Sequence, residues 1–160
     1  GLMLPSGNDA ALALGRQVAG NDEMFVARMN ALVARIGLTE TTYRNAHGLP
    51  APGHLTSAYD LAMLARYAMT LPDFVATVGL RQRTIQGSRT IALTNTNTLL
   101  GVYQGTDGVK TGYTEEAGRT MVVSATRNGH RVFVALLNAP DRDEDAKKLL
   151  DWAFTNFVFG

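Results

Sequence analysis

The sequence predicts an α+β fold: a helical cluster followed by an antiparallel sheet, with a C-terminal helix packed on that sheet. Up to about residue 80, apolar residues recur at the spacing of a helix, except over residues 38–55, where Gly and Pro turns predict an ordered loop. Beyond it, short runs of alternating polar and apolar residues are separated by Gly-containing turns, and the last segment returns to helical spacing. Helices and strands that are segregated along the chain favour a layered α+β fold over a parallel sheet.

Four helices are expected in the first half of the chain, each beginning at a residue suited to a helix N-terminus. Ser, Thr, Asn and Asp accept hydrogen bonds from first-turn N–H groups, and Pro has no N–H to leave unpaired. Gly20 and Gly37 end the first two helices. The expected helices are residues 8–19, one opened by Asn21 or Asp22, one opened by Thr56 or Ser57, and a short one opened by Pro72.

The second half is expected to be mostly extended. Gly87-Ser88 and Asn128-Gly129 provide tight turns between neighbouring strands. The expected extended segments are residues 81–86, 89–93, 108–114, 120–126 and 131–139.

A closing helix is expected over residues 141–157. Trp152, Phe154 and Phe157 recur at helical spacing, so we expect them to pack in the core. The charged run of residues 141–145 is expected to open this helix on its solvated side.

Composition excludes several function classes. With 46% hydrophobic and 18% charged residues, the chain can form a core and shows no sign of disorder. A net charge of +1 without a basic cluster argues against nucleic-acid binding. No Cys is present, which excludes disulfides and thiolate metal sites. His47, His54 and His130 are too dispersed to predict a metal site, and we interpret His47 and His54 as structural.

Two tripeptides carry the candidate chemistry. Ser6-Gly7-Asn8 stands at the start of the first helix, and Lys110-Thr111-Gly112 lies on a predicted strand. Each is weak alone, because Ser6 or Asn8 could be a plain helix cap and Lys110 a surface lysine. Together, on those elements, they favour acyl transfer, which needs a serine alkoxide, a proton route, a cation near developing charge and a clamp for a substrate carboxylate.

Each tripeptide supplies part of that set. The Ser6 hydroxyl suits a proton relay, and the Asn8 carboxamide suits binding of a substrate amide. In the second motif, Lys110 provides positive charge and Thr111 provides a hydroxyl for a terminal carboxylate. Gly112 leaves room for a peptide along the strand edge, and Tyr113 provides a backbone N–H for an oxyanion.

From end to end the chain resembles the serine D-Ala-D-Ala carboxypeptidases, the low-molecular-mass penicillin-binding proteins of peptidase family S11. That family uses an S-x-N and a K-T-G motif in the roles just given. Gly7, where class A β-lactamases usually have Asp, favours a carboxypeptidase. The resemblance is carried by residues 4–11, 45–49, 56–62, 95–100, 107–114 and 117–118.

The resemblance implies an incomplete fold of the penicillin-binding protein and β-lactamase-like transpeptidase kind. Residues 1–160 would form a single partial catalytic domain, with a helical part over about 1–80, a hairpin over 81–94 and a sheet part over about 106–160. The parent would hydrolyse the terminal D-Ala-D-Ala bond of peptidoglycan stem peptides through a serine acyl-enzyme. Alternatives are a β-lactamase or DD-endopeptidase on the same scaffold, or a non-catalytic peptidoglycan-binding module.

The resemblance further implies β-lactam antibiotics as ligands and a bacterial, extracytoplasmic location, where the peptidoglycan lies. It implies no cofactor, no metal and no nucleic-acid partner.

The chain departs from the family in one motif. The family's nucleophile lies in an S-x-x-K motif upstream of S-x-N, but Asp107, Glu144 and Asp145 stand three residues before the only lysines. We therefore expect this chain alone to be inactive and its partner to be a missing N-terminal segment that carries S-x-x-K. We also expect stable folding only with that segment, because the apolar strand at 131–139 would otherwise present an unpaired edge.

Overall fold

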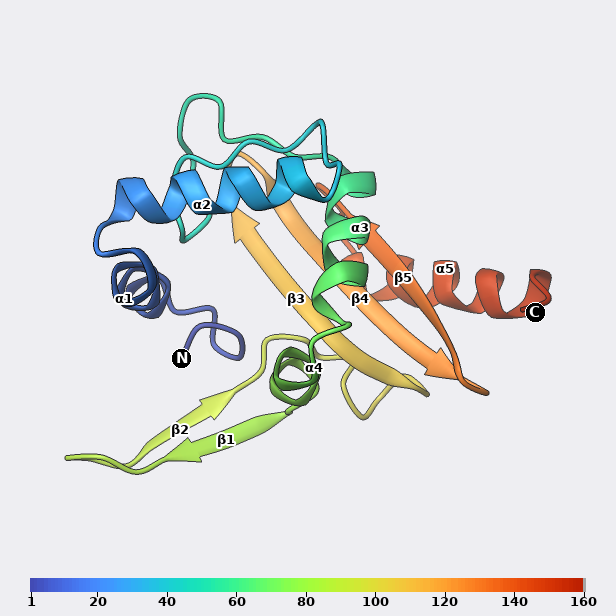
Figure 1. Cartoon of the computed structure of the whole chain (residues 1–160). Coiled ribbons are helices and arrows are strands. Elements are labelled where there is room, and N and C mark those ends of the chain that lie inside the picture. Colours follow the sequence, from blue (N-terminus) through green and yellow to red (C-terminus); the bar gives the residue numbers. More distant parts are fainter. Residues whose placement is uncertain (160) are drawn as a thin grey trace.

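A computed structural model describes residues 1–159 and has the expected α+β architecture (Figure 1). Helices precede the main sheet in the sequence, and one helix follows it. Its elements are α1 (Asn8–Ala19), α2 (Asp22–Arg35), α3 (Ala58–Ala68), α4 (Pro72–Val78), β1 (Gln82–Ile85), β2 (Ile91–Thr94), β3 (Thr106–Thr114), β4 (Gly118–Arg127), β5 (His130–Leu136) and α5 (Arg142–Asn156).

The main sheet is antiparallel, with the strand order β3-β4-β5, so that β3 and β5 are its edges. The helix α5 lies against one face, and α3 and α4 lie against the other (Figure 1). Side chains alternate along β4 between these faces, as the pleat requires. One core cluster comprises Leu99, Met121, Val123, Ala125, Val134, Ala146 and Leu150, and the other comprises Ala65, Met69, Val78, Val109 and Val122.

The helix starts follow the predicted chemistry except at α1. Asn21 accepts a hydrogen bond from the Met24 N–H, and Ser57 accepts one from the Asp60 N–H. The N-cap of α1 is Gly7, and no side chain caps that helix. The plain-cap alternative for the first tripeptide is therefore wrong, and its polar side chains are available for other contacts.

The closing helix packs less of its aromatic surface than the sequence predicts. Phe154 packs against the core cluster under α5. Trp152 is 57% exposed and Phe157 is 53% exposed, and their rings meet edge to face at 5.1 Å. The predicted core packing is wrong for these two rings, which lie near the end of the helix and cover each other.

No helix within residues 1–159 combines the length and the apolar character that crossing a bilayer requires.

Candidate active site

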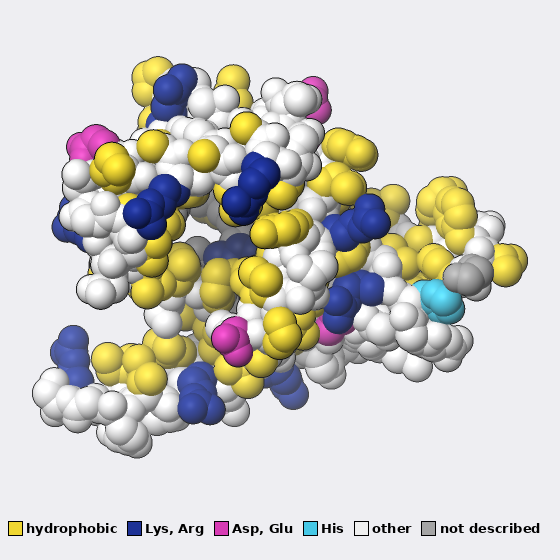
Figure 2. Space-filling model, viewed as in Figure 1, with side chains coloured by type: hydrophobic (Ala, Val, Ile, Leu, Met, Phe, Trp, Pro, Cys, Tyr) yellow, Lys and Arg dark blue, Asp and Glu magenta, His cyan; other side chains and the backbone are white. Residues whose placement is uncertain are grey.

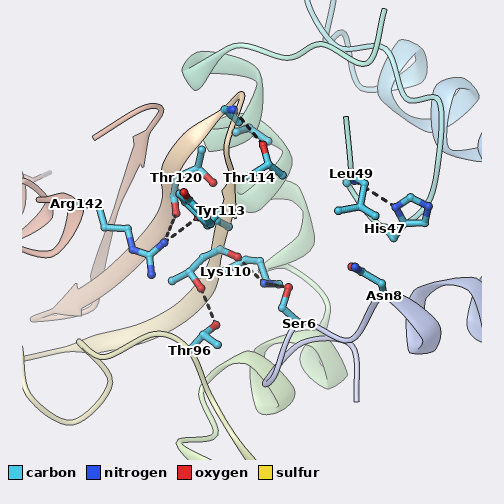
Figure 3. A pocket seen from close by; sticks show the side chains of 15 residues that line it. Ser6, Asn8, His47, Leu49, Thr96, Lys110, Tyr113, Thr114, Thr120 and Arg142 are labelled. Carbon is cyan, nitrogen blue, oxygen red and sulfur yellow. Dashed lines mark hydrogen bonds between the residues drawn. The ribbon is translucent and has the colours of Figure 1, made fainter. Parts of the chain in front are cut away.

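A cleft of about 600 Å³ lies between the start of α1 and the edge strand β3. All of the predicted site residues line it (Figure 3). The structure therefore brings the two tripeptides together across more than half of the chain, while the role of each residue stays a prediction. These residues are Ser6, Asn8, Lys110, Thr111, Gly112 and Tyr113.

The two motifs touch through Lys110 and Ser6. The Lys110 ammonium donates to the Ser6 hydroxyl at 2.8 Å and to the Thr111 carbonyl at 2.5 Å (Figure 3). Burial, together with the positive charge of Arg142, lowers the pKa of Lys110 from 10.5 to about 8. The ammonium is therefore close to its titration range at neutral pH, which makes it a candidate for both charge stabilisation and proton exchange.

A backbone turn aims Ser6 at the sheet. Ser6 has φ 61°, a left-handed conformation that is uncommon for residues other than glycine. Just before it, the buried Leu4 accepts a hydrogen bond through its carbonyl from the Thr96 N–H at 3.1 Å. The Thr96 hydroxyl in turn lies 2.6 Å from that of Thr111. Thr96 thus connects the turn at Ser6 to β3 through hydrogen bonds.

Arg142 is a site residue that the sequence analysis missed. Its guanidinium lines the cleft and donates to the carbonyls of Gly112 at 2.8 Å and Thr120 at 3.2 Å (Figure 3). The charged run around it does open α5 as predicted, but Arg142 points back onto the sheet. No spacing rule could reveal this, because the contact depends on how α5 packs against β4 and β5.

Gly112 is required by its neighbour on β4 as well as by the open strand edge. A Cβ at this position would lie 2.5 Å from the Thr120 hydroxyl oxygen. Real Cβ atoms do not approach other atoms so closely, so a side chain here would force the Thr120 side chain or the two strands to shift. The neighbouring Tyr113 ring is 66% exposed at the mouth of the cleft.

The ordered loop between α2 and α3 lines the cleft on its helical side. Asn45 accepts from the Gly48 N–H and donates to the Leu49 carbonyl, and the His47 ring accepts from the Leu49 N–H. The His47 ring thus helps to hold the loop, and it also lines the cleft, which the sequence analysis missed. At the base of the loop the buried Asp60 carboxylate accepts from the Glu40 N–H and the Thr41 hydroxyl.

Among residues 1–159, no group of three or more His, Asp or Glu side chains is arranged to hold a metal ion. The polar groups that line the cleft are instead hydroxyls, amides, the His47 ring and the cations Lys110 and Arg142. Such a set suits binding an anionic or strongly polar ligand.

Comparison with known proteins identifies the family. Residues 1–141 match the family model of the D-alanyl-D-alanine carboxypeptidases, peptidase S11. The chain belongs to this family. Among curated members it is 35% identical to D-alanyl-D-alanine carboxypeptidase DacF of Bacillus subtilis and 39% identical to DacD of Salmonella typhimurium. Those alignments cover 98% and 99% of this chain but 42% and 41% of the relatives, so the chain spans about two fifths of their length.

Solved structures of the family carry the same fold. The Streptomyces K15 DD-transpeptidase superposes with a TM-score of 0.92 at 34% identity, over 97% of this chain and 65% of that one. D-alanyl-D-alanine carboxypeptidase from Mycobacterium tuberculosis H37Rv superposes with a TM-score of 0.90 at 34% identity, over 98% of this chain and 62% of that one. The predicted penicillin-binding protein fold is therefore confirmed for the residues covered.

Proposed function

We propose that the intact protein hydrolyses the terminal D-Ala-D-Ala bond of peptidoglycan stem peptides through a serine acyl-enzyme. The observation that carries the proposal is the 2.8 Å hydrogen bond between Lys110 and Ser6, which joins the two motifs of the family in one cleft. Peptidoglycan lies outside the cytoplasmic membrane, so the proposal includes an extracytoplasmic location.

The cleft offers a binding place for a terminal carboxylate. Lys110 and Arg142 carry positive charge in it, and Thr111, the residue after Lys110 on β3, lines the same cleft. Charge-assisted hydrogen bonds to a carboxylate contribute roughly twice as much as neutral ones. In the proposed complex these three residues hold the C-terminal carboxylate of the substrate and so restrict the enzyme to carboxypeptidase-type cleavage.

The peptide chain of the substrate would lie along the free edge of β3. Within residues 1–159 this strand pairs only with β4, so its other edge is open to an added strand. In this arrangement the N–H of Tyr113 stabilises the oxyanion, and the Asn8 carboxamide holds a substrate amide. The Ser6 hydroxyl, bonded to Lys110, relays the proton to the departing D-alanine.

The nucleophile of this chemistry is proposed to lie in a part of the intact protein outside these 160 residues. No serine of the chain stands three residues before a lysine, as the family motif S-x-x-K requires. The segment with that motif is therefore the proposed partner of the cleft, and the present chain contributes substrate binding and proton relay.

The test uses the intact protein and a peptide that ends in D-Ala-D-Ala. We expect release of one D-alanine per peptide, and no release from the same peptide ending in L-Ala-L-Ala. Lys110→Ala and Ser6→Ala variants should lose most of this activity, about 100-fold or more, because each removes a group acting in the transition state. Unchanged rates in both variants would refute the proposal.

β-Lactams are the proposed inhibitors of the same cleft. Penicillin-binding protein D2 of Listeria monocytogenes, solved in its ampicillin-bound form, superposes with a TM-score of 0.85 at 34% identity. Peptide mapping of the intact protein after ampicillin treatment should find the covalent adduct on a serine in S-x-x-K. An adduct on Ser6 would contradict the division of roles.

DD-transpeptidation is a second candidate, favoured by the similarity to the K15 DD-transpeptidase. Both reactions share the acyl-enzyme and differ in whether water or an amine resolves it. Adding an amine acceptor such as glycine to the assay separates them: a transpeptidase diverts the acyl group into a new peptide bond, whereas a carboxypeptidase continues to give the hydrolysed product.

A further inference from the structure

The hairpin formed by β1 and β2 projects from the body of the protein, and no other helix or strand of residues 1–159 covers it (Figure 1). Every residue from 81 to 92 is exposed, on both faces of the hairpin. Isolated two-stranded hairpins are marginally stable in water. A long exposed hairpin of this kind is therefore expected to contact something outside the described chain.

The charge of this hairpin is all of one sign. No acidic residue occurs between Asp73 and Asp107, and all three arginines of that stretch belong to the hairpin: Arg81, Arg83 and Arg89. Figure 2 shows the projecting arm with basic side chains on either side of a small hydrophobic area and no acidic ones. The arm therefore has the charge that an anionic partner requires.

A polar cavity of about 410 Å³ lies at the base of the hairpin. Arg81 lines it, and its side chain lies across Gly101, where a Cβ would come within 3.1 to 3.3 Å of it. Asn95 and Asn97 also line the cavity, but their amides bind backbone groups of Val78, Leu80 and Gly108. Thr98 lines the cavity too, but its hydroxyl donates to the Asp143 carboxylate, so the groups that remain for a ligand are Arg81, Gln82 and the hydroxyl of Thr94.

One short segment joins this cavity to the candidate active site. Asn95 and Asn97 line the cavity, whereas Thr96 between them lines the cleft and bonds Thr111. Asn97 also donates to the Gly108 carbonyl on β3, at 2.9 Å. The cavity at the base of the hairpin and the cleft are therefore neighbours on the surface of the protein.

We propose that the hairpin and its basal cavity form a second binding surface for the polymeric substrate. The inference rests on the proposed function. Peptidoglycan presents many stem peptides, and their free carboxylates match the three arginines. A bilayer is the other anionic surface to consider, but the hairpin has no aromatic residue and six side chains with a hydroxyl or amide between residues 82 and 94, a composition suited to a hydrated polymer.

The experiment compares two variants of the intact protein with equal loss of charge. Arg83→Gln/Arg89→Gln removes two cations from the hairpin, and Arg35→Gln/Arg66→Gln removes two exposed cations from α2 and α3. Each is assayed for co-sedimentation with isolated peptidoglycan sacculi at low and high salt, and for D-alanine release from sacculi and from a soluble peptide. Equal melting temperatures establish that both variants are folded.

We expect the hairpin variant to bind sacculi and act on them about tenfold less well at low salt, with unchanged kcat/KM on the soluble peptide. The control variant should behave like the parent. Equal losses in both variants, or none in either, would overturn the proposal. Both variants are also tested for binding to anionic phospholipid vesicles. If the hairpin variant loses binding to the vesicles but still binds sacculi, the proposal is overturned in favour of a membrane surface. If the soluble peptide is not cleaved by the parent, the proposed function fails, while the sedimentation result still decides whether the hairpin binds the polymer.

Discussion

The guanidinium of Arg142, at the first residue of α5, donates a 2.8 Å hydrogen bond to the carbonyl of Gly112 on β3. A second bond, to the Thr120 carbonyl, fixes the same group against β4. The packing of α5 on the sheet thus places the positive charge of Arg142 in the same cleft as Lys110. The positive charge of Arg142 also contributes to the low pKa of that lysine.

Arg142→Gln should weaken catalysis by the intact protein. A charge-assisted hydrogen bond to a buried partner is worth about 1.5–3 kcal/mol, which corresponds to a fall of roughly 10- to 100-fold in kcat/KM for a peptide ending in D-Ala-D-Ala. A peptide with an amidated C-terminus should show a much smaller fall, because it lacks the carboxylate. Equal falls for both peptides would mean that Arg142 acts only through the fold.

Gly112→Ala should destabilise the sheet, and a second change should repair it. The added methyl would lie 2.5 Å from the Thr120 hydroxyl oxygen, and overpacking of this kind costs about 1–3 kcal/mol. The Thr120 Cβ lies farther away, at 3.9 Å, so Thr120→Ala removes the clash. Urea unfolding of the intact protein should show the double variant to be more stable than Gly112→Ala alone. Additive losses would show that the contact is not the cause.

Much of this fold follows from local sequence signals. Asn21, Ser57 and Pro72 begin their helices because cap and proline chemistry acts within one turn. Likewise, the Asn128-Gly129 turn joins β4 to β5 as its dipeptide predicts. Elements were therefore predictable to within a few residues at their ends.

What the sequence could not reveal depends on contacts between distant elements. Arg142 reaches the cleft only because α5 lies on the sheet, and its acidic neighbours made it look like part of a solvated helix end. Trp152 has helical spacing but lies on the exposed side of α5. Helical periodicity predicts that a helix has an apolar face, but it does not predict how much of that face the sheet covers.

Asp60→Ala should loosen the loop that covers the cleft. The Asp60 side chain is buried, at 2% residue exposure, and accepts from the Glu40 N–H and the Thr41 hydroxyl. Leaving these donors without an acceptor should lower the free energy of unfolding by about 2–3 kcal/mol, as measured by urea denaturation of the intact protein. Asp73→Ala, at an exposed carboxylate on α4, is the matched control and should change it by less than about 0.5 kcal/mol.

As pH rises above neutral, the titration of Lys110 should lower the activity of the intact protein and raise the stability of its folded state. Its pKa is lowered to about 8 in the fold from an ordinary value of 10.5, by burial first and then by the charge of Arg142. Between these values the unfolded chain binds a proton that the folded chain releases, so this residue makes the folded state more stable as pH rises through that window. In the proposed complex the Lys110 ammonium binds the substrate carboxylate, so kcat/KM should fall as pH rises above about 8.

Lys110→Arg tests the assignment, because a guanidinium stays charged throughout this range. The variant should lose activity at neutral pH through altered geometry, yet its remaining kcat/KM should no longer fall between pH 8 and 10, the window set by the Lys110 pKa of about 8. Arg35→Lys, an exposed substitution on α2, should leave the parental profile unchanged. If the alkaline fall persists in Lys110→Arg with the same midpoint, another group titrates and the charge of Lys110 does not limit the reaction.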